Sequence, residues 1–263
     1  MTRIGRLFEK LKSEGRCGMI AYLTAGDPSA ETTPELVAAL ERGGADLIEL
    51  GVPFSDPIAD GPIIQQAGDR ALRAGMTLAK VLDIAGEIRK TSEIPLLLFT
   101  YLNPALRYGF ERLAKDAKAA GIDGCLLTDV SVEEAEEYVK IMRDAELDTV
   151  FLAAPTSTDE RLELIARYSS GFVYLVSRTG ITGVRQSIAD SAGPLIERMR
   201  ARTTLPIAMG FGISTPDHVG QLAGKVDAVV VGSAIVRQIE KDSSQLASFM
   251  RELHRPLEHV EIS

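Results

Sequence analysis

The chain has 263 residues, of which 45% are hydrophobic and 25% are charged, so it can bury a full core without disulfide bonds. Its net charge of −8 argues against a surface that binds nucleic acid or an anionic membrane, because such surfaces are basic. Cys17 and Cys125 lack companions at metal-ligand spacing, which predicts reduced thiols in a cytoplasmic protein. The N-terminus is charged and no apolar run reaches membrane length, so we expect neither a signal peptide nor a membrane span.

Short apolar segments recur along the chain, each followed by turn residues and a helix-like stretch. Their almost continuous hydrophobicity is typical of parallel strands that are covered on both faces. The eight expected strands are Gly18–Leu23, Ala45–Gly51, Pro95–Tyr101, Gly124–Asp129, Thr149–Ala153, Phe172–Ser177, Pro206–Gly212 and Ala228–Ala234. Eight alternations predict an α/β fold, a single (β/α)8 TIM barrel, whereas a doubly wound open sheet, the competing architecture, usually has fewer strands.

Two further helices are expected beyond the eight repeats. The segment Met1–Lys12 has the pattern of a helix that closes the bottom of the barrel, and Pro62–Ala74 is expected to form an extra helix after the second strand. No linker rich in serine, glycine or proline interrupts the chain. We therefore expect residues 1–263 to form a single domain.

A carboxylate lies within the second expected strand. Glu49 stands among Leu47, Ile48 and Leu50, where an ionised and unpaired carboxylate is costly, so its pKa is expected to be raised. A raised pKa suits a general acid/base at neutral pH, while a structural ion pair or a buried hydrogen bond is the alternative interpretation.

The active sites of such barrels lie on the loops that follow the strands, which restricts the candidate catalytic groups. The histidines, His218, His254 and His259, all lie away from the strand ends, which argues against a histidine base or a metal site. A Schiff-base aldolase requires a lysine on a strand, and no expected strand of this chain contains one. The leading acid/base candidates are therefore the carboxylates Glu49, Asp56, Asp60 and Asp129.

Three glycine-rich segments follow the last strands. They are Arg178–Gly183, a candidate mobile lid, Gly210–Ser214, and Gly232-Ser233 at the start of a helix. Each alone is explained by tight-turn geometry, but together they favour a phosphate site made of backbone N–H groups. Several aromatic residues are expected near the same mouth and would line a slot for a flat ring: Tyr22, Phe54, Phe99, Tyr101, Tyr174 and Phe211.

These motifs resemble those of a known family. The run from Leu47 to Gly61, LIELGVPFSDPIADG, is similar to the signature of the tryptophan synthase alpha chain family. The segments Tyr22–Pro28, Arg178–Gly183 and Gly210–Ser214 are also similar to motifs of that family. The resemblance extends from about Gly18 to Ser233.

The resemblance implies a lyase that cleaves indole-3-glycerol phosphate to indole and glyceraldehyde 3-phosphate. It implies no cofactor in this chain, and a beta chain as partner that carries pyridoxal phosphate, in an alpha2beta2 tetramer. Glu49 would then be the acid/base and Asp60 would hold the indole N–H. On this view Glu49 needs a raised pKa and Asp60 an ordinary one.

The resemblance also assigns the remaining site residues. Substrate-binding residues would be Tyr22, Phe99, Leu126 and Tyr174 at the ring and glycerol portions, Gly183, Gly212, Gly232 and Ser233 at the phosphate, and Thr182, which would meet Asp60 when the lid closes. Pro53 and Asp56 would belong to a loop that signals to the beta chain.

Three alternatives to a lyase coupled to a beta chain remain open from the sequence. One is a stand-alone lyase that releases free indole. Another is a catalytically silent barrel that binds a phosphate ligand and activates a partner, against which the intact Glu49 and Asp60 argue. The third, an indole-glycerol phosphate synthase, is disfavoured by the missing strand lysine.

Overall fold

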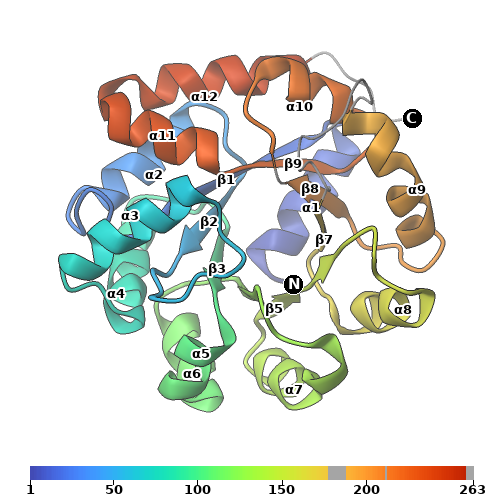
Figure 1. The fold of residues 1–263 in the computed structure, drawn as a ribbon, viewed down its shortest axis with the longest axis horizontal. Coiled ribbons are helices and arrows are strands. Elements are labelled where there is room, and N and C mark those ends of the chain that lie inside the picture. The colour runs from blue at the N-terminus through green and yellow to red at the C-terminus, as the bar shows by residue number, and fades with distance from the viewer. Residues whose placement is uncertain (177–187, 211, 259–263) are drawn as a thin grey trace.

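The strands form one parallel sheet that is rolled into a barrel, with helices around it (Figure 1). The computed structural model describes residues 1–176, 188–210 and 212–258. Its strands are β1 (Gly18–Thr24), β2 (Leu47–Gly51), β3 (Leu96–Thr100), β4 (Gly124–Leu127), β5 (Asp148–Val150), β6 (Leu152–Ala153), β7 (Val173–Val176), β8 (Ile207–Gly210) and β9 (Ala228–Val231). They confirm the eight expected segments and the predicted fold class.

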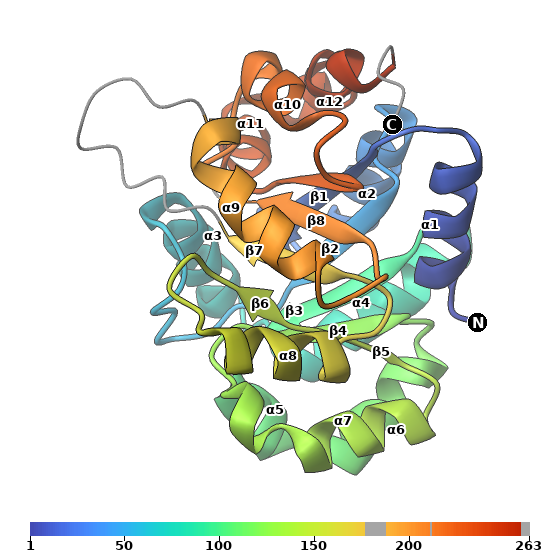
Figure 2. The same cartoon turned by 90° about the vertical axis from the view of Figure 1, so that its right-hand side faces the viewer.

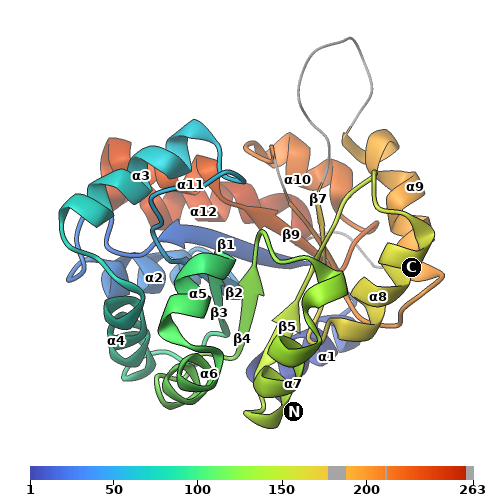
Figure 3. The same cartoon turned by 60° about the horizontal axis from the view of Figure 1, so that its bottom comes forward.

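The helices surround the strands and cover the outer face of the barrel (Figure 3). They are α1 (Arg3–Ser13), α2 (Thr33–Arg42), α3 (Pro62–Arg73), α4 (Leu78–Arg89), α5 (Leu102–Tyr108), α6 (Phe110–Ala119), α7 (Glu136–Asp144), α8 (Asp159–Tyr168), α9 (Ile188–Arg200), α10 (Pro216–Leu222), α11 (Ser233–Asp242) and α12 (Leu246–His254). Short 3-10 helices cover Val132–Glu134, Ser243–Gln245 and Arg255–Leu257. The extra helix expected after the second strand is α3.

The expected fifth strand appears as two pieces, which explains why the sheet has nine strands. The break falls at Phe151, between β5 and β6. The sheet order is β5-β4-β3-β2-β1-β9-β8-β7-β6, so β5 pairs with β4 while β6 pairs with β7. The two ends of the sheet are thus consecutive pieces of one extended segment, and the barrel closes through that segment.

Alternation along each strand divides the core into two layers. Side chains two residues apart point to the same face of a strand, so one set fills the barrel and the other packs under the helices. In β2, Ile48 and Leu50 belong to the outer layer, whereas Leu47 packs with the interior cluster. Glu49 shares the parity of Leu47 and therefore points into the barrel.

Helix α1 closes the end of the barrel at which the strands begin (Figure 2). Its buried side chains Ile4, Phe8 and Leu11 pack with the interior cluster, and the Phe8 ring lies 5.5 Å from that of Phe172. The predicted bottom helix is confirmed. An amphipathic helix here removes from water apolar side chains that a bare barrel end would expose.

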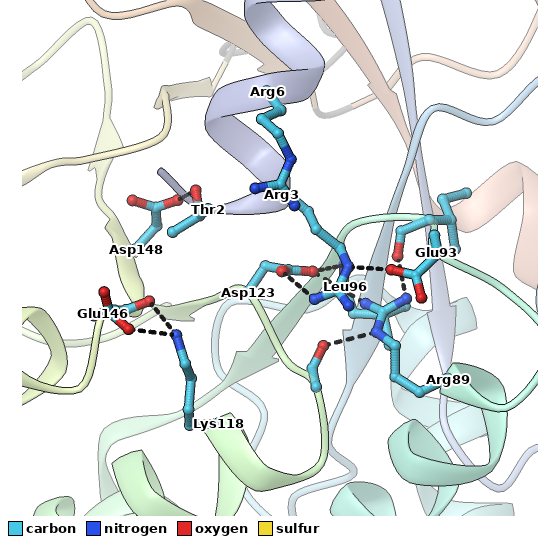
Figure 4. Close-up of polar contacts among 12 residues, drawn as sticks. Thr2, Arg3, Arg6, Arg89, Glu93, Leu96, Lys118, Asp123, Glu146 and Asp148 are labelled. Carbon is cyan, nitrogen blue, oxygen red and sulfur yellow. Dashed lines mark hydrogen bonds and ion pairs between the residues drawn. The ribbon is translucent and has the colours of Figure 1, made fainter.

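Polar contacts fix α1 to the starts of the strands (Figure 4). Thr2 caps the helix by accepting a hydrogen bond from the Gly5 amide, and its hydroxyl donates to Asp148 at the start of β5. The buried carboxylate of Asp123 accepts from Arg3 at 3.1 Å and from Arg89 at 3.0 Å. Arginines from α1 and α4 thus meet at one buried acid.

No helix in the described ranges 1–176, 188–210 and 212–258 is long and apolar enough to cross a lipid bilayer.

Candidate active site

A cavity of about 510 Å³ opens at the end of the barrel where the strands finish. It lies opposite α1, as barrel active sites do relative to the stabilising bottom face. The residues that line it come from β1, β2, β3, β7 and β9, from the loops that follow β2, β8 and β9, and from helices α3 and α11: Tyr22, Glu49, Ala59, Asp60, Gly61, Ile64, Phe99, Tyr174, Gly212, Ile213, Ser214, Val230, Gly232, Ser233, Ala234 and Arg237.

Glu49 projects into this cavity from the middle of β2. Glu49 is 1% exposed, and its Oε1 atom has no hydrogen-bond partner within the described ranges. Burial raises the pKa of Glu49 to about 8, because an ionised carboxylate is poorly solvated there. At neutral pH the side chain is therefore a protonated acid with a free oxygen facing the cavity, which is the state a general acid requires.

Asp60 faces the cavity from the loop between β2 and α3, and it differs from the sequence expectation. Burial raises the pKa of Asp60 to about 6, whereas we expected an ordinary value. A hydrogen bond from the Tyr101 hydroxyl opposes that rise, and the same hydroxyl accepts from the Ala59 amide at 3.2 Å. Tyr101 thus fixes the loop and keeps Asp60 largely ionised at neutral pH.

Aromatic side chains line the same cavity as the two carboxyl groups. The rings of Tyr22 and Phe99 meet edge to face, 5.2 Å apart, and Tyr174 lines the cavity beside them. Burial raises the pKa values of Tyr22 and Tyr174, and nearby carboxyl groups add to the rise, Asp60 more than Glu49 for Tyr22 and Glu49 for Tyr174, so both hydroxyls stay protonated. The wall is flat and apolar, which suits a planar ring.

Two glycines make room for these tyrosines. A Cβ atom on Gly51 would lie 2.3 Å from the Tyr22 hydroxyl, and one on Gly210 would lie 2.2 Å from the Tyr174 hydroxyl. Both distances are far below van der Waals contact, so any side chain at these positions would displace a tyrosine. Gly210, which the sequence placed in a phosphate motif, therefore shapes the aromatic wall instead.

Glycines and the start of a helix also line the cavity. Gly212 follows β8, while Gly232 precedes α11, whose first residue is Ser233. The first N–H groups of a helix have no carbonyl partner within it, and the helix dipole favours an anion there. Gly212 has φ of +75°, a conformation that glycine adopts without strain. This side of the cavity is built to accept an anion.

An arginine connects the helices on the two sides of the cavity. Arg70 of α3 binds both carboxylate oxygens of the buried Asp27, at 2.7 and 2.8 Å, and also pairs with Glu240 of α11 at 3.0 Å. Figures 1 and 3 show α3 and α11 next to each other. The bridge links the helix that follows the Asp60 loop to the helix whose first residues line the cavity.

The predicted site residues divide into three groups. Those that line the cavity are Glu49, Asp60, Tyr22, Phe99, Tyr174, Gly212, Gly232 and Ser233. Leu126 is fully buried in the barrel interior, and Pro53 and Asp56 lie on the loop after β2 outside the cavity wall. Thr182 and Gly183, the whole predicted lid Arg178–Gly183, and Phe211 fall outside the described residues.

One acid/base candidate has a structural role. Asp129, after β4, accepts a hydrogen bond of 2.6 Å from the Leu102 amide at the start of α5, and it does not line the cavity. The pairing satisfies an N–H group that the helix leaves unpaired.

Sequence reasoning missed two residues of the site. Tyr101 stood only in the group of aromatic residues, and its hydrogen bond to the Asp60 loop depends on how that loop folds back. Arg237 was not considered, although it lies four residues after Ser233 on the expected helix and so shares its face. That spacing is the signal that would have found it.

Metal ligands are not assembled in the described ranges. Nowhere in residues 1–176, 188–210 and 212–258 do three or more histidine, cysteine, aspartate or glutamate side chains gather as a metal site.

The chain is similar to known proteins along nearly its whole length. The family model described as tryptophan synthase alpha chain matches residues 8–261. A tryptophan synthase alpha chain of Solibacter usitatus is 68% identical over 97% of this chain and 98% of its own length, and one of Geotalea uraniireducens is 50% identical over 92% and 90%.

Solved structures agree with these sequence relatives. Tryptophan synthase subunit alpha from Legionella pneumophila superposes with a TM-score of 0.92 at 34% identity, covering 99% of this chain and 100% of its own. A chain of tryptophan synthase from M. tuberculosis gives 0.90 at 33% identity, covering 97% and 98%. The chain belongs to the tryptophan synthase alpha chain family.

Proposed function

We propose that this chain cleaves indole-3-glycerol phosphate into indole and glyceraldehyde 3-phosphate. The observation that carries the proposal is Glu49, a buried carboxyl with an unpaired oxygen and a pKa of about 8, in a cavity with an aromatic wall. The amides near Gly212 and Ser233 supply the phosphate end. Family membership supports the same reaction.

Glu49 performs the two proton transfers that the cleavage needs. Its protonated carboxyl donates to C3 of the indole ring, which leaves positive charge on the ring nitrogen. The hydroxyl on the carbon attached to C3 then loses its proton to the Glu49 carboxylate as the carbon–carbon bond breaks. The bonding electrons restore the aromatic ring and the side-chain carbon becomes an aldehyde. Glu49 ends protonated, as it began.

Asp60 stabilises the cation that forms between these steps. As a carboxylate it accepts a hydrogen bond from the indole N–H, and this interaction strengthens as the nitrogen becomes positive. The different surroundings of the two carboxyl groups keep Glu49 protonated and Asp60 ionised between about pH 6 and 8. The division of roles follows from that difference.

The partner is a beta chain, in an alpha2beta2 assembly. The surface that contacts this partner is expected to expose apolar groups near the site. Ile58, in the loop that also carries Asp56 and Asp60, is 83% exposed. Leu106 of α5 is 53% exposed. Pyridoxal phosphate belongs to the beta chain, and the chemistry of this chain uses only its own carboxyls and amides. The two buried free thiols, Cys17 and Cys125, fit a cytoplasmic location.

The site residues outside the described cavity wall retain their proposed roles. Leu126 would contact the ring and glycerol portions, Thr182 would meet Asp60 when the lid closes, and Gly183 would add an amide to the phosphate site. Pro53 and Asp56 would transmit the state of the site to the beta chain.

Indole release tests the proposal. The purified chain is incubated with indole-3-glycerol phosphate, alone and with a beta chain, and indole is quantified. We expect slow release by the chain alone and strong activation by the partner. Rapid release without a partner would indicate an independent indole producer, and no release under either condition would contradict the lyase assignment.

A further inference from the structure

The cavity has a charge imbalance that the assigned residues do not resolve. Of the two carboxyl groups on its wall, Glu49 is protonated at neutral pH, whereas Asp60 is ionised and faces the cavity in a chain with net charge −8. The amides of Gly212 and Ser233 carry only partial charge. A phosphate dianion that enters this site therefore meets a negative field unless a cation compensates.

Arg237 lies where a side chain could supply this positive charge. Among the described residues of the cavity wall it is the one lysine or arginine, and it lies one helical turn beyond Ser233 on the same face of α11. Its side chain is exposed at the mouth of the cavity.

The guanidinium of Arg237 is also uncommitted within the described structure. The neighbouring acid on α11, Glu240, already pairs with Arg70 of α3. Within residues 1–176, 188–210 and 212–258 no hydrogen bond or ion pair engages the Arg237 side chain, in contrast to Arg70, which is held by Asp27 and Glu240. An unpaired guanidinium at a cavity edge lined by amides is a fork-shaped donor that matches a phosphate.

We propose that Arg237 is a further substrate-binding residue, which contacts the phosphate of the phosphorylated indole substrate together with the amides at the start of α11. The inference rests on the proposed function for the identity of the substrate. It assigns to the site the full positive charge that glycine amides and a serine cannot supply. It also makes binding selective for the phosphorylated form.

The test compares four proteins: the wild type, Arg237→Gln, Arg237→Lys, and Lys241→Gln as the matched control. Lys241 lies one turn further along α11 and does not line the cavity, so its loss changes net charge equally. Binding is measured by calorimetry with indole-3-glycerol phosphate and with unphosphorylated indole-3-glycerol, and steady-state KM and kcat are determined.

We expect Arg237→Gln to weaken binding of the phosphate ester and raise its KM by about tenfold or more, since a hydrogen bond to a charged group is lost. Binding of the unphosphorylated ligand and kcat should stay near wild type, Arg237→Lys should recover part of the affinity, and Lys241→Gln should behave as wild type. Equal affinity of Arg237→Gln and wild type for the phosphate ester would overturn the inference, as would an equal loss in Lys241→Gln.

The two proposals fail differently. A wild type that releases indole while Arg237→Gln keeps its KM overturns the role of Arg237 alone. A wild type that binds the ester through Arg237 but releases no indole contradicts the lyase and leaves the phosphate contact in place.

Discussion

At the scale of single residues, the two carboxyl groups of the cavity owe their difference to their neighbours. Glu49 has only apolar and aromatic surroundings, and its pKa rises to about 8. Asp60 is also raised by burial, but the Tyr101 hydroxyl opposes the rise and its pKa is about 6. The deeper burial of Glu49 and the hydrogen bond to Asp60 together separate the proposed acid from the carboxylate proposed to stabilise the cation.

The first prediction concerns the pH dependence of kcat/KM, which we expect to be bell-shaped with midpoints near 6 and 8. Activity is lost below the lower value as Asp60 takes up a proton and above the higher one as Glu49 loses its proton. Tyr101→Phe removes a hydrogen bond that favours ionised Asp60, so the acid limb should move to higher pH. The limb near 8 should not move.

The substrate phosphate titrates equally with both proteins, so the difference between their profiles reports on Asp60. We expect kcat/KM at pH 7 to fall by about tenfold in Tyr101→Phe. An unchanged acid limb would show that Tyr101 does not control Asp60.

The second prediction concerns Gly210. A methyl group there would overlap the Tyr174 hydroxyl, so Gly210→Ala should move Tyr174 and lower kcat/KM by about a hundredfold. Gly86→Ala, in a helix position with open space around it, is the matched control and should keep full activity. Wild-type kinetics in Gly210→Ala would mean that the aromatic wall is not needed for turnover.

At the scale of elements, α1 and the strands it closes form the stable end of the barrel. Asp123 connects three elements at this end, because it accepts hydrogen bonds from Arg3 of α1, Arg89 of α4 and the Leu96 amide of β3. This cluster lies at the strand starts, whereas the cavity lies at the strand ends. The cluster that stabilises the fold and the cavity that carries the candidate site therefore lie at opposite ends of the barrel axis.

The third prediction follows from that separation. Asp123→Asn leaves the largely buried Arg89 without its charged partner and should lower the free energy of unfolding by about 3 kcal/mol. Activity per folded molecule should stay at the wild-type level. Denaturant unfolding measures the first quantity and active-site-normalised turnover the second.

Glu93→Gln is the control, since this side chain is 79% exposed and pairs with Arg3 on the surface. It should change stability little. A loss of turnover in folded Asp123→Asn would contradict the division of the barrel into two ends.

The sequence predicted the elements well because buried parallel strands are continuous apolar runs. The break of the fifth strand at Phe151 had no sequence signal, since it reflects how the barrel closes between β4 and β7. The burial and the raised pKa of Glu49 were predictable from its strand alone. Asp129 was misassigned and the pKa of Asp60 was misjudged, because both depend on loops that bring Leu102 and Tyr101 to them.

At the scale of the whole molecule, the active site reduces the stability of the fold. Glu49 binds its proton more tightly in the folded protein, where its pKa is about 8, than at its ordinary value of 4.5. Between these values the folded state holds more protons than the unfolded chain, so stability falls as pH rises. The proposed mechanism explains why the carboxyl is retained in the barrel at that cost, since both proton transfers use it.

The fourth prediction is that Glu49→Gln unfolds at nearly the wild-type temperature at pH 5 but at a higher temperature at pH 8.5. Glutamine cannot ionise, so it lacks the penalty that grows as the wild type is titrated. Each kcal/mol corresponds to about 2–4 °C for a domain of this size. Glu9→Gln, at an exposed position on α1, should show no such difference between the two pH values. A pH-independent offset for Glu49→Gln would contradict the raised pKa.

The central claim is that Glu49 carries both proton transfers of the cleavage. Its most direct test is to titrate Glu49→Gln with indole-3-glycerol phosphate by calorimetry and to assay indole release by the same sample with a beta chain present. We predict affinity close to that of the wild type and turnover reduced by at least about a hundredfold. Turnover within a few-fold of the wild type, with binding intact, would contradict the claim.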